Sequence, residues 1–276
     1  MPKRNEKKTA KKRTAERAAK KNNKYWRERA INEEAGVDRL STETSEKMAK
    51  LYRQSYRRLT NEINALYAEI LDNGLEEMTR SQLYTLNHYT RLRDAVSKEV
   101  EGLAKAEQQS LGSLLDVIAV DTYRSNCEEL GIDFGLVAEL EAKSIVTENW
   151  SGITFSNRIW KNADNFNVRV MDDIESLIVS GKNPADVKKK LMEDYGVKWN
   201  EADRLIRTES SRAYNKAARD SYTAAGIDKC EYLAESDCCD ICAHYKGRKM
   251  PISDFPELPM HPNCRCTIAP IVEGFK

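Results

Sequence analysis

Apolar residues recur at spacings of three and four over long stretches of the first half of the chain. One stretch covers 45–71, a second 83–103 and a third 111–130. This spacing is typical of amphipathic helices, and Asn73-Gly74 is a suitable stop after the first. Because none of the three stretches contains a proline, the pattern predicts a region of long helices over residues 31–140.

The composition changes near Asn149, where Trp150, Phe155 and Trp160 fall within eleven residues. Large aromatic side chains grouped in this way usually belong to a core or a docking surface. We interpret Trp150 and Trp160 as structural residues at the entry of a second domain, which we expect to span 141–276.

Three helices are predicted to follow this aromatic run. The first ends at Gly181, and the second begins at Asn183-Pro184, a good helix start with a capping side chain and a proline at the first helical position. We expect the second to end at Tyr195-Gly196 and the third to begin at Asn200 and continue to Gly226.

A carboxylate interrupts the buried stripe predicted for the last of these helices. Glu209 lies among alanines and Ile206, where a buried charge needs a partner. Arg212 is one turn further along the helix, and Arg158 is a more distant candidate. A general base or metal ligand is the alternative role, but no second acidic residue accompanies Glu209, so we interpret Glu209 and Arg212 as a structural ion pair.

Beyond Gly226 the pattern becomes extended, with strand-like segments at 230–233, 248–252 and 265–272 separated by a proline-rich loop. A sheet of this size has little core of its own. The predicted fold is therefore mainly α, with a small β element at the C-terminus that needs a further source of stability (α+β).

The formal net charge of +1 conceals a strong asymmetry along the 276 residues. Residues 1–30 carry thirteen Lys and Arg against three Glu, a balance of +10, while the remaining 32 basic and 41 acidic residues give −9. No apolar run is long enough to cross a bilayer, and the basic N-terminus lacks the apolar segment of a secretory signal. We expect a cytosolic origin, no membrane partner and a disordered basic arm over 1–30.

Contact with a nucleic-acid backbone is one role for such an arm, since basic side chains that neutralise phosphates release counterions. A solvated tail, or a tail that contacts an acidic protein, is the alternative. The basic residues that we expect to contact DNA are Lys7, Lys8, Lys11, Lys12, Arg13, Arg17, Lys20 and Lys21.

Six of the seven cysteines and two of the three histidines lie between residues 230 and 270. Thiolate and imidazole are the ligands that zinc prefers, and Cys239-x-x-Cys242 supplies one half of a tetrahedral site. The cluster His261-Pro-Asn-Cys264-Arg-Cys266 supplies the other half. We predict a structural zinc site within 229–272, because four protein ligands leave no open position for water.

The fourth ligand of this site is ambiguous from the sequence. A tight turn at Pro262-Asn263 would bring His261 and Cys264 together, whereas an extended 264–266 segment would direct Cys264 and Cys266 to one side. Cys239, Cys242 and Cys264 belong to both of these possible ligand sets. Free or disulfide-forming cysteines, or a catalytic metal, are the alternatives to structural zinc.

Several of these blocks occur together in one family. In chain order they are Trp150-Ser-Gly, Arg158-Ile-Trp160, Arg207-Thr-Glu209, Ala225-Gly226-Ile, Cys239-x-x-Cys242, Gly247 and His261-Pro-Asn-Cys264-Arg-Cys266. With this order the chain resembles the phage Mu F-like head morphogenesis family, the minor head proteins of tailed bacteriophages. The resemblance covers Glu141 to Val272, about half of the chain.

The resemblance implies a non-enzymatic virion protein that takes part in procapsid assembly with the portal and with capsid or scaffold proteins, and in DNA packaging or delivery. It would occupy the host cytoplasm during assembly and the head afterwards. A zinc-containing nucleic-acid-binding protein is the alternative function. A metal-dependent hydrolase is a third, but no spacing singles out a general base.

Overall fold

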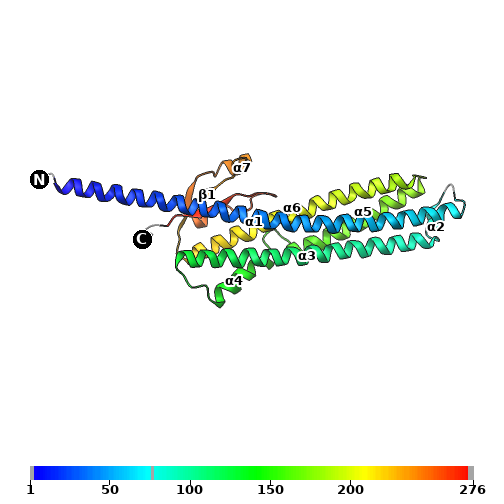
Figure 1. Ribbon diagram of the computed structural model, residues 1–276, viewed down its shortest axis with the longest axis horizontal. Coiled ribbons are helices and arrows are strands. Elements are labelled where there is room, and N and C mark those ends of the chain that lie inside the picture. The colour runs from blue at the N-terminus through cyan, green and yellow to red at the C-terminus, as the bar shows by residue number, and fades with distance from the viewer. Residues whose placement is uncertain (1–2, 76–77, 273–276) are drawn as a thin grey trace. The chain divides into compact units, whose positions relative to one another are not determined.

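The computed structural model describes residues 3–75 and 78–272, with side chains from Lys21 onward (Figure 1). The described chain is mainly α, with one three-stranded antiparallel sheet near the C-terminus. This architecture confirms the predicted fold class. No helix of the described residues combines the length and apolar character that a membrane span requires.

The first helix, α1 (Lys3–Asp72), is continuous from the basic segment to the predicted helix at 45–71 (Figure 1). We expected a disordered arm over 1–30, and the structure differs because helix starts at Lys3. Ala, Lys, Arg and Glu dominate this segment and are all good helix formers. Trp26 and Ala30, within the expected arm, are buried.

The next two helices are α2 (Arg80–Leu83) and α3 (Asn87–Leu130). Thr79 caps α2 in a capping box, in which its hydroxyl accepts from the Gln82 backbone and the Gln82 side chain accepts from the Thr79 backbone. α3 joins the second and third predicted helical stretches into a single helix, since no breaker separates them.

Helix α4 (Leu136–Thr147) precedes the aromatic run, and α5 (Phe155–Val179) contains its second half. Thr154 caps α5 by accepting from the backbone N–H of Asn157. Trp160 therefore lies on a helix, whereas Trp150 lies in the bend before it.

The long helix α6 (Pro184–Ala224) corrects our prediction of two helices divided at Tyr195-Gly196. Asn183 begins it as expected, because its side-chain oxygen accepts from the backbone N–H groups of Ala185 and Asp186 at 2.9 and 3.0 Å. An interior glycine costs a helix only about 1 kcal/mol relative to alanine. Burial of Tyr195 before the glycine and of Ala202 after it offsets that cost.

The sheet is formed by β1 (Lys229–Leu233), β2 (Lys249–Pro251) and β3 (Thr267–Pro270) in the order β2-β1-β3. Cys230 faces Met250 across one pairing and Pro270 across the other. The short helix α7 (Asp240–Ala243) and the 3-10 turn η1 (Ile252–Asp254) lie in the connections. The three strands agree with the extended segments expected after Gly226.

The chain divides into two compact units, each made of separate stretches of sequence. The unit that we call the sheet unit contains the described residues up to Ser41, Leu114–Val146 and those from Arg207 onward. The helical unit contains the described residues of Thr42–Ser113 and Thr147–Ile206. This division differs from the contiguous domains 31–140 and 141–276 that we expected.

The core of the sheet unit joins the end of α6 to the sheet and to the cysteine-rich loops. Its buried members are Ala218, Tyr222, Cys230, Tyr232, Cys242, Phe255, Leu258, Cys264, Cys266 and Ile268. Candidate metal ligands are thus part of the core itself. Their position links the chemistry of the site to the stability of the unit.

Candidate metal centre

Helix α7 positions the first two candidate ligands. Cys239 is the N-cap residue of this helix and Cys242 is its third residue, so about one helical turn separates them and both sulfurs lie on the same side. The carbonyl of Cys239 accepts from the backbone N–H of Ala243 at 2.9 Å, which closes that turn. Cys239 is exposed and Cys242 is buried.

A tight turn positions the second half of the site. Asn263 has φ +62°, in the left-handed region that Asn tolerates better than most residues, and the Cys264 N–H donates to the His261 carbonyl at 3.2 Å. The turn directs His261 and Cys264 back toward α7. This turn corresponds to the first of the two alternatives considered from the sequence, a tight turn at Pro262-Asn263.

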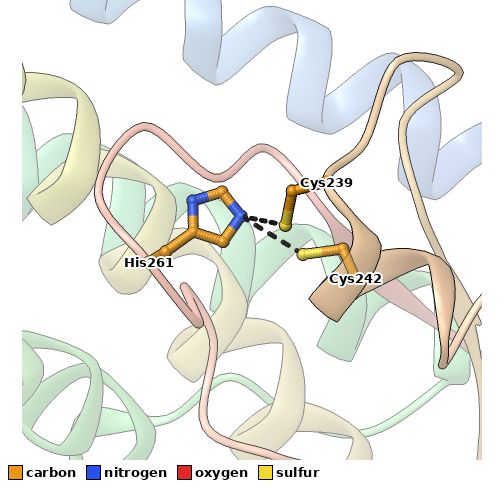
Figure 2. Close-up of side chains that lie close together, drawn as sticks. All are labelled: Cys239, Cys242 and His261. Carbon is orange, nitrogen blue, oxygen red and sulfur yellow. Dashed lines mark hydrogen bonds between the residues drawn. The ribbon is translucent and has the colours of Figure 1, made fainter.

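The imidazole of His261 faces both sulfurs of the Cys-x-x-Cys pair (Figure 2). Its Nε2 lies 3.2 Å from Cys239 Sγ and 3.3 Å from Cys242 Sγ. Its Nδ1 lies 2.9 Å from the carbonyl oxygen of Pro262, which only accepts, so Nδ1 carries the proton. The lone pair of Nε2 then points toward the sulfurs, the arrangement that metal-ligating histidines show.

Cys242 also belongs to a second group of donors. The sulfurs of Cys242, Cys264 and Cys266 lie within 4.8 Å of one another, as do the donor atoms of Cys239, Cys242 and His261. Cys242 Sγ and Cys264 Sγ are 3.7 Å apart. Two sulfurs bound to one tetrahedral zinc are about 3.8 Å apart, and sulfur and nitrogen about 3.6 Å, from the usual bond lengths. The donor types and spacings therefore fit a zinc-sized ion.

The thiols of Cys242, Cys264 and Cys266 differ in pKa. A hydrogen bond from Cys264 lowers the pKa of Cys266 to about 5, and the same bond, together with burial, raises the pKa of Cys264. Burial raises the pKa of Cys242 to about 11. Without a metal the cluster thus favours one thiolate at Cys266, and a bound cation would displace protons from the other thiols.

The structure brings the five predicted metal ligands into two overlapping donor groups that share Cys242. The two ligand sets that the sequence left open overlap, because the turn at Asn263 directs His261 inward while Cys264 and Cys266 both approach Cys242. Among the described residues, Cys238 belongs to neither donor group. Burial raises the pKa of Cys230 to about 12, as expected for a cysteine that fills a core.

The predicted pair Glu209 and Arg212 is a buried ion pair on α6. Arg212 Nε donates to a Glu209 carboxylate oxygen at 3.0 Å, and its Nη2 donates to the Ile145 carbonyl at 2.6 Å. The guanidinium therefore ties α6 to the end of α4 within the sheet unit. Glu209 and Arg212 belong to neither donor group of the metal centre.

The remaining predicted residues lie apart from the metal centre. Trp160 Nε1 donates to Gln108 Oε1 at 2.8 Å in the helical unit, and Trp150 is half-buried. Lys21 is exposed on α1. The other seven basic residues predicted to contact DNA lie on the α1 backbone, and their side chains fall outside the described residues.

Sequence reasoning missed the polar side chains that attach the metal loops to the long helices. Thr208 and Asn215 of α6 bond to the backbone at Asn263 and Cys266. Arg265 lies between the candidate ligands Cys264 and Cys266, and its guanidinium is 3.5 Å from the Asp38 carboxylate of α1. The Arg207-Thr-Glu209 block was the one signal in the sequence that pointed to this part of α6.

Comparison with known families supports the resemblance noted from the sequence. Residues 168–269 match the family model described as Phage Mu protein F like protein. The match includes α6, all five candidate metal ligands and the sheet except its last residue, Pro270. It is narrower than the range from Glu141 to Val272, and Trp150 and Trp160 lie outside it. No curated protein and no solved structure matches the chain. The part of the chain that carries the candidate metal centre is thus similar to the Phage Mu protein F like family.

Proposed function

We propose that this protein is a structural minor head protein of a tailed bacteriophage, which acts in procapsid assembly with the portal and with capsid or scaffold proteins. The observation that carries the proposal is the family match over 168–269, a segment that includes every donor of the metal centre. Family membership alone does not fix a function. The proposal therefore needs a test in the assembled particle.

Quantitative mass spectrometry of purified procapsids and mature virions, measured against the major capsid protein, provides that test. A few copies per particle are expected of a minor head protein. Presence in procapsids alone would indicate an assembly factor lost on maturation. Absence from both particles would overturn the proposal and favour the zinc-containing nucleic-acid-binding protein.

Within this function, we propose that the metal is zinc and that its role is structural. Cysteine and histidine donors select zinc among the common metals, and the two overlapping donor groups that share Cys242 offer enough ligands to fill a tetrahedral site without water. We expect Cys239, Cys242, His261 and Cys264 to bind the ion, because distances of 3.2–3.7 Å connect these four in series. Cys266 is the alternative to His261.

Cobalt(II) substitution distinguishes a closed site from an open one. A closed site with four protein ligands gives intense tetrahedral d–d bands and thiolate-to-cobalt charge transfer. Weak bands of five- or six-coordinate cobalt would indicate bound water and would contradict a purely structural role. In the same spectra, His261→Ala should alter the bands more than Cys266→Ser if His261 is the fourth ligand.

The basic segment supports a further part of the proposal, contact with DNA. Residues 1–30 carry a balance of +10 on an otherwise acidic chain, and α1 holds them on a helical backbone from Lys3. Such a segment suits a protein that works in a DNA-filled shell. Binding through phosphates alone would be independent of sequence.

A further inference from the structure

Two side chains of α6 bond to the backbone of the segment that carries the metal-binding cysteines. The N–H of Asn263 donates to Thr208 Oγ1 at 3.2 Å, and Asn215 Nδ2 donates to the carbonyl of Cys266 at 3.1 Å. These two hydrogen bonds lie on either side of Cys264. The segment 263–266 is therefore held at both ends by one helix.

The spacing of the two residues on α6 explains how one helix reaches both ends. Thr208 and Asn215 are seven residues apart, about two helical turns, so they lie on the same face. Their partners, the N–H of Asn263 and the carbonyl of Cys266, lie at the two ends of the segment. The helix thus provides hydrogen-bonding groups at a spacing that matches the cysteine segment.

The orientation of the Asn215 amide is fixed by its surroundings. Its Nδ2 also donates to the carbonyl of Ser211 at 2.9 Å, and both acceptors are carbonyl oxygens that cannot donate. The nitrogen must therefore face Cys266. Asn215 is 4% exposed, so the hydrogen bond is shielded from competing water.

We propose that Thr208 and Asn215 are positioning residues of the metal centre, which hold the Asn263–Cys266 segment in the conformation that metal binding requires. The inference rests on the proposed metal site and extends it to residues that do not touch the ion. A segment already held in place loses less conformational freedom when its thiolates bind the ion. Groups that orient ligands in this way typically change metal affinity by about 10- to 100-fold.

The test is the zinc affinity of the full-length protein, measured by competition with a chromophoric chelator. Thr208→Val removes the acceptor hydroxyl with little change in shape, and we expect zinc affinity to fall by about 10-fold or more. Thr208→Ser keeps the hydroxyl and should restore most of the affinity. Thr223→Val is the matched control, because Thr223 lies on the same helix, is exposed and bonds only locally to the Arg219 carbonyl at 2.9 Å.

Asn215→Asp tests the other end of the segment, since an ionised carboxylate of the same size cannot donate to the Cys266 carbonyl. Its zinc affinity should also fall. Because a buried charge at this position can prevent folding, Thr208→Val, at a half-buried position, remains the deciding variant. Cobalt-substituted Thr208→Val should in addition show a shifted charge-transfer band.

Unfolding in zinc and in chelator separates positioning from general stability. A positioning role predicts that Thr208→Val lowers the free energy of unfolding more in zinc than in chelator. The extra loss in zinc should correspond to the measured fold-loss in zinc affinity. If Thr208→Val destabilises the protein equally in zinc and in chelator, the positioning role is wrong. It is also wrong if the wild type binds zinc and Thr208→Val binds it with the same affinity; either result leaves the metal site itself standing. A wild-type protein that binds no zinc would overturn the metal site as well.

Discussion

Cys242 is the cysteine whose sulfur belongs to both donor groups of the described chain, and its thiol lies in the core of the sheet unit. We predict that Cys242→Ser lowers zinc content to below about a tenth of an ion per chain, because a serine hydroxyl stays protonated and binds zinc poorly. Cys238→Ser is the control, since Cys238 is four residues away and in neither donor group of the described residues. Zinc content can be measured by elemental mass spectrometry. Equal zinc in the two variants would exclude Cys242 as a ligand.

Glu34 gives the sheet unit a second testable property at the scale of one residue. Burial raises its pKa to about 8, with a further increase from Glu235 and Asp38 and an opposing effect of Arg265. Because the folded state holds the proton more tightly than the unfolded state, stability is greatest below the unfolded pKa of about 4.5 and falls as pH rises to about 8.

We therefore predict that Glu34→Gln raises the free energy of unfolding above pH 8 by about 2–4 kcal/mol and has little effect at pH 4. Chemical denaturation across this pH range provides the measurement. Glu43→Gln, at an exposed position on the same helix, is the control variant. A Glu34→Gln protein with the pH profile of the wild type would show that Glu34 is ionised in the folded state at neutral pH.

At this scale, residue chemistry and spacing predicted the five candidate donors that the structure groups around Cys242, but not which four would bind one ion. The choice depends on the backbone at Asn263, where the φ of +62° closes a turn while the sulfurs of Cys264 and Cys266 both still lie within 4.8 Å of the Cys242 sulfur. Thr208 and Asn215 could not be predicted, because polar residues on a helix have no spacing that identifies a distant backbone partner.

At the scale of elements, α6 shows where local rules give the wrong boundary. We placed a break at Tyr195-Gly196 because glycine has a low helix propensity, yet the helix continues through it. Its burial pattern before and after Gly196 stays in register, with Leu191, Tyr195, Ala202 and Ile206 all buried. Packing over several turns therefore decided the boundary rather than one residue.

The same glycine provides a stability prediction. Gly196 is exposed, and a Cβ built at its position meets no atom within 4 Å. Gly196→Ala should raise the free energy of unfolding by about 0.5–1 kcal/mol, because alanine has the higher helix propensity. Gly181→Ala is the matched control, since Gly181 is equally open but has φ +75°, and it should destabilise instead. Thermal unfolding measures both; a loss of stability in Gly196→Ala would indicate a strained helix at this position.

A buried ion pair joins two helices inside the helical unit. Lys198 Nζ of α6 lies 3.1 and 3.3 Å from the two carboxylate oxygens of Glu107 of α3, and Tyr52 of α1 donates to the same carboxylate. The side chains of Glu107 and Lys198 are almost completely buried. Removing one partner would therefore leave an uncompensated charge in the core.

We predict that Lys198→Met lowers the free energy of unfolding by about 3–5 kcal/mol, whereas the double variant Glu107→Gln/Lys198→Met recovers a large part of that loss. Chemical denaturation of the two single variants and the double variant gives the coupling energy. Additive losses would show that the two side chains act independently of each other.

At the scale of the whole molecule, the charge asymmetry predicts DNA binding through α1. Replacing the eight basic residues Lys7, Lys8, Lys11, Lys12, Arg13, Arg17, Lys20 and Lys21 by Gln should weaken binding to duplex DNA. The slope of log affinity against log salt should decrease by up to about 0.9 for each phosphate that is no longer neutralised. Replacing the exposed Arg91, Arg93 and Lys98 of α3 is the control. Equal effects for each charge removed would show non-specific attraction rather than binding by the arm.

The division of the chain into units was beyond reach of the sequence. Periodicity identifies each helix but not which parts of a long helix pack together, and α1, α3 and α6 contribute residues to both units. The C-terminal sheet was predictable because Gly226 and the prolines mark its limits. The packing of its Leu233 and Ala269 against Ala30 of α1 could not be predicted, and neither could the hydrogen bond from the Tyr214 hydroxyl of α6 to the Ala30 carbonyl.

The zinc content of the full-length protein, purified without chelator and measured by elemental mass spectrometry, tests the metal centre most directly. One zinc per chain is predicted, with a loss of the sheet unit's stability when a chelator removes it. Zinc near zero in a protein whose sheet unit remains folded would contradict the account, since the thiols of the core would then be packing residues and not ligands.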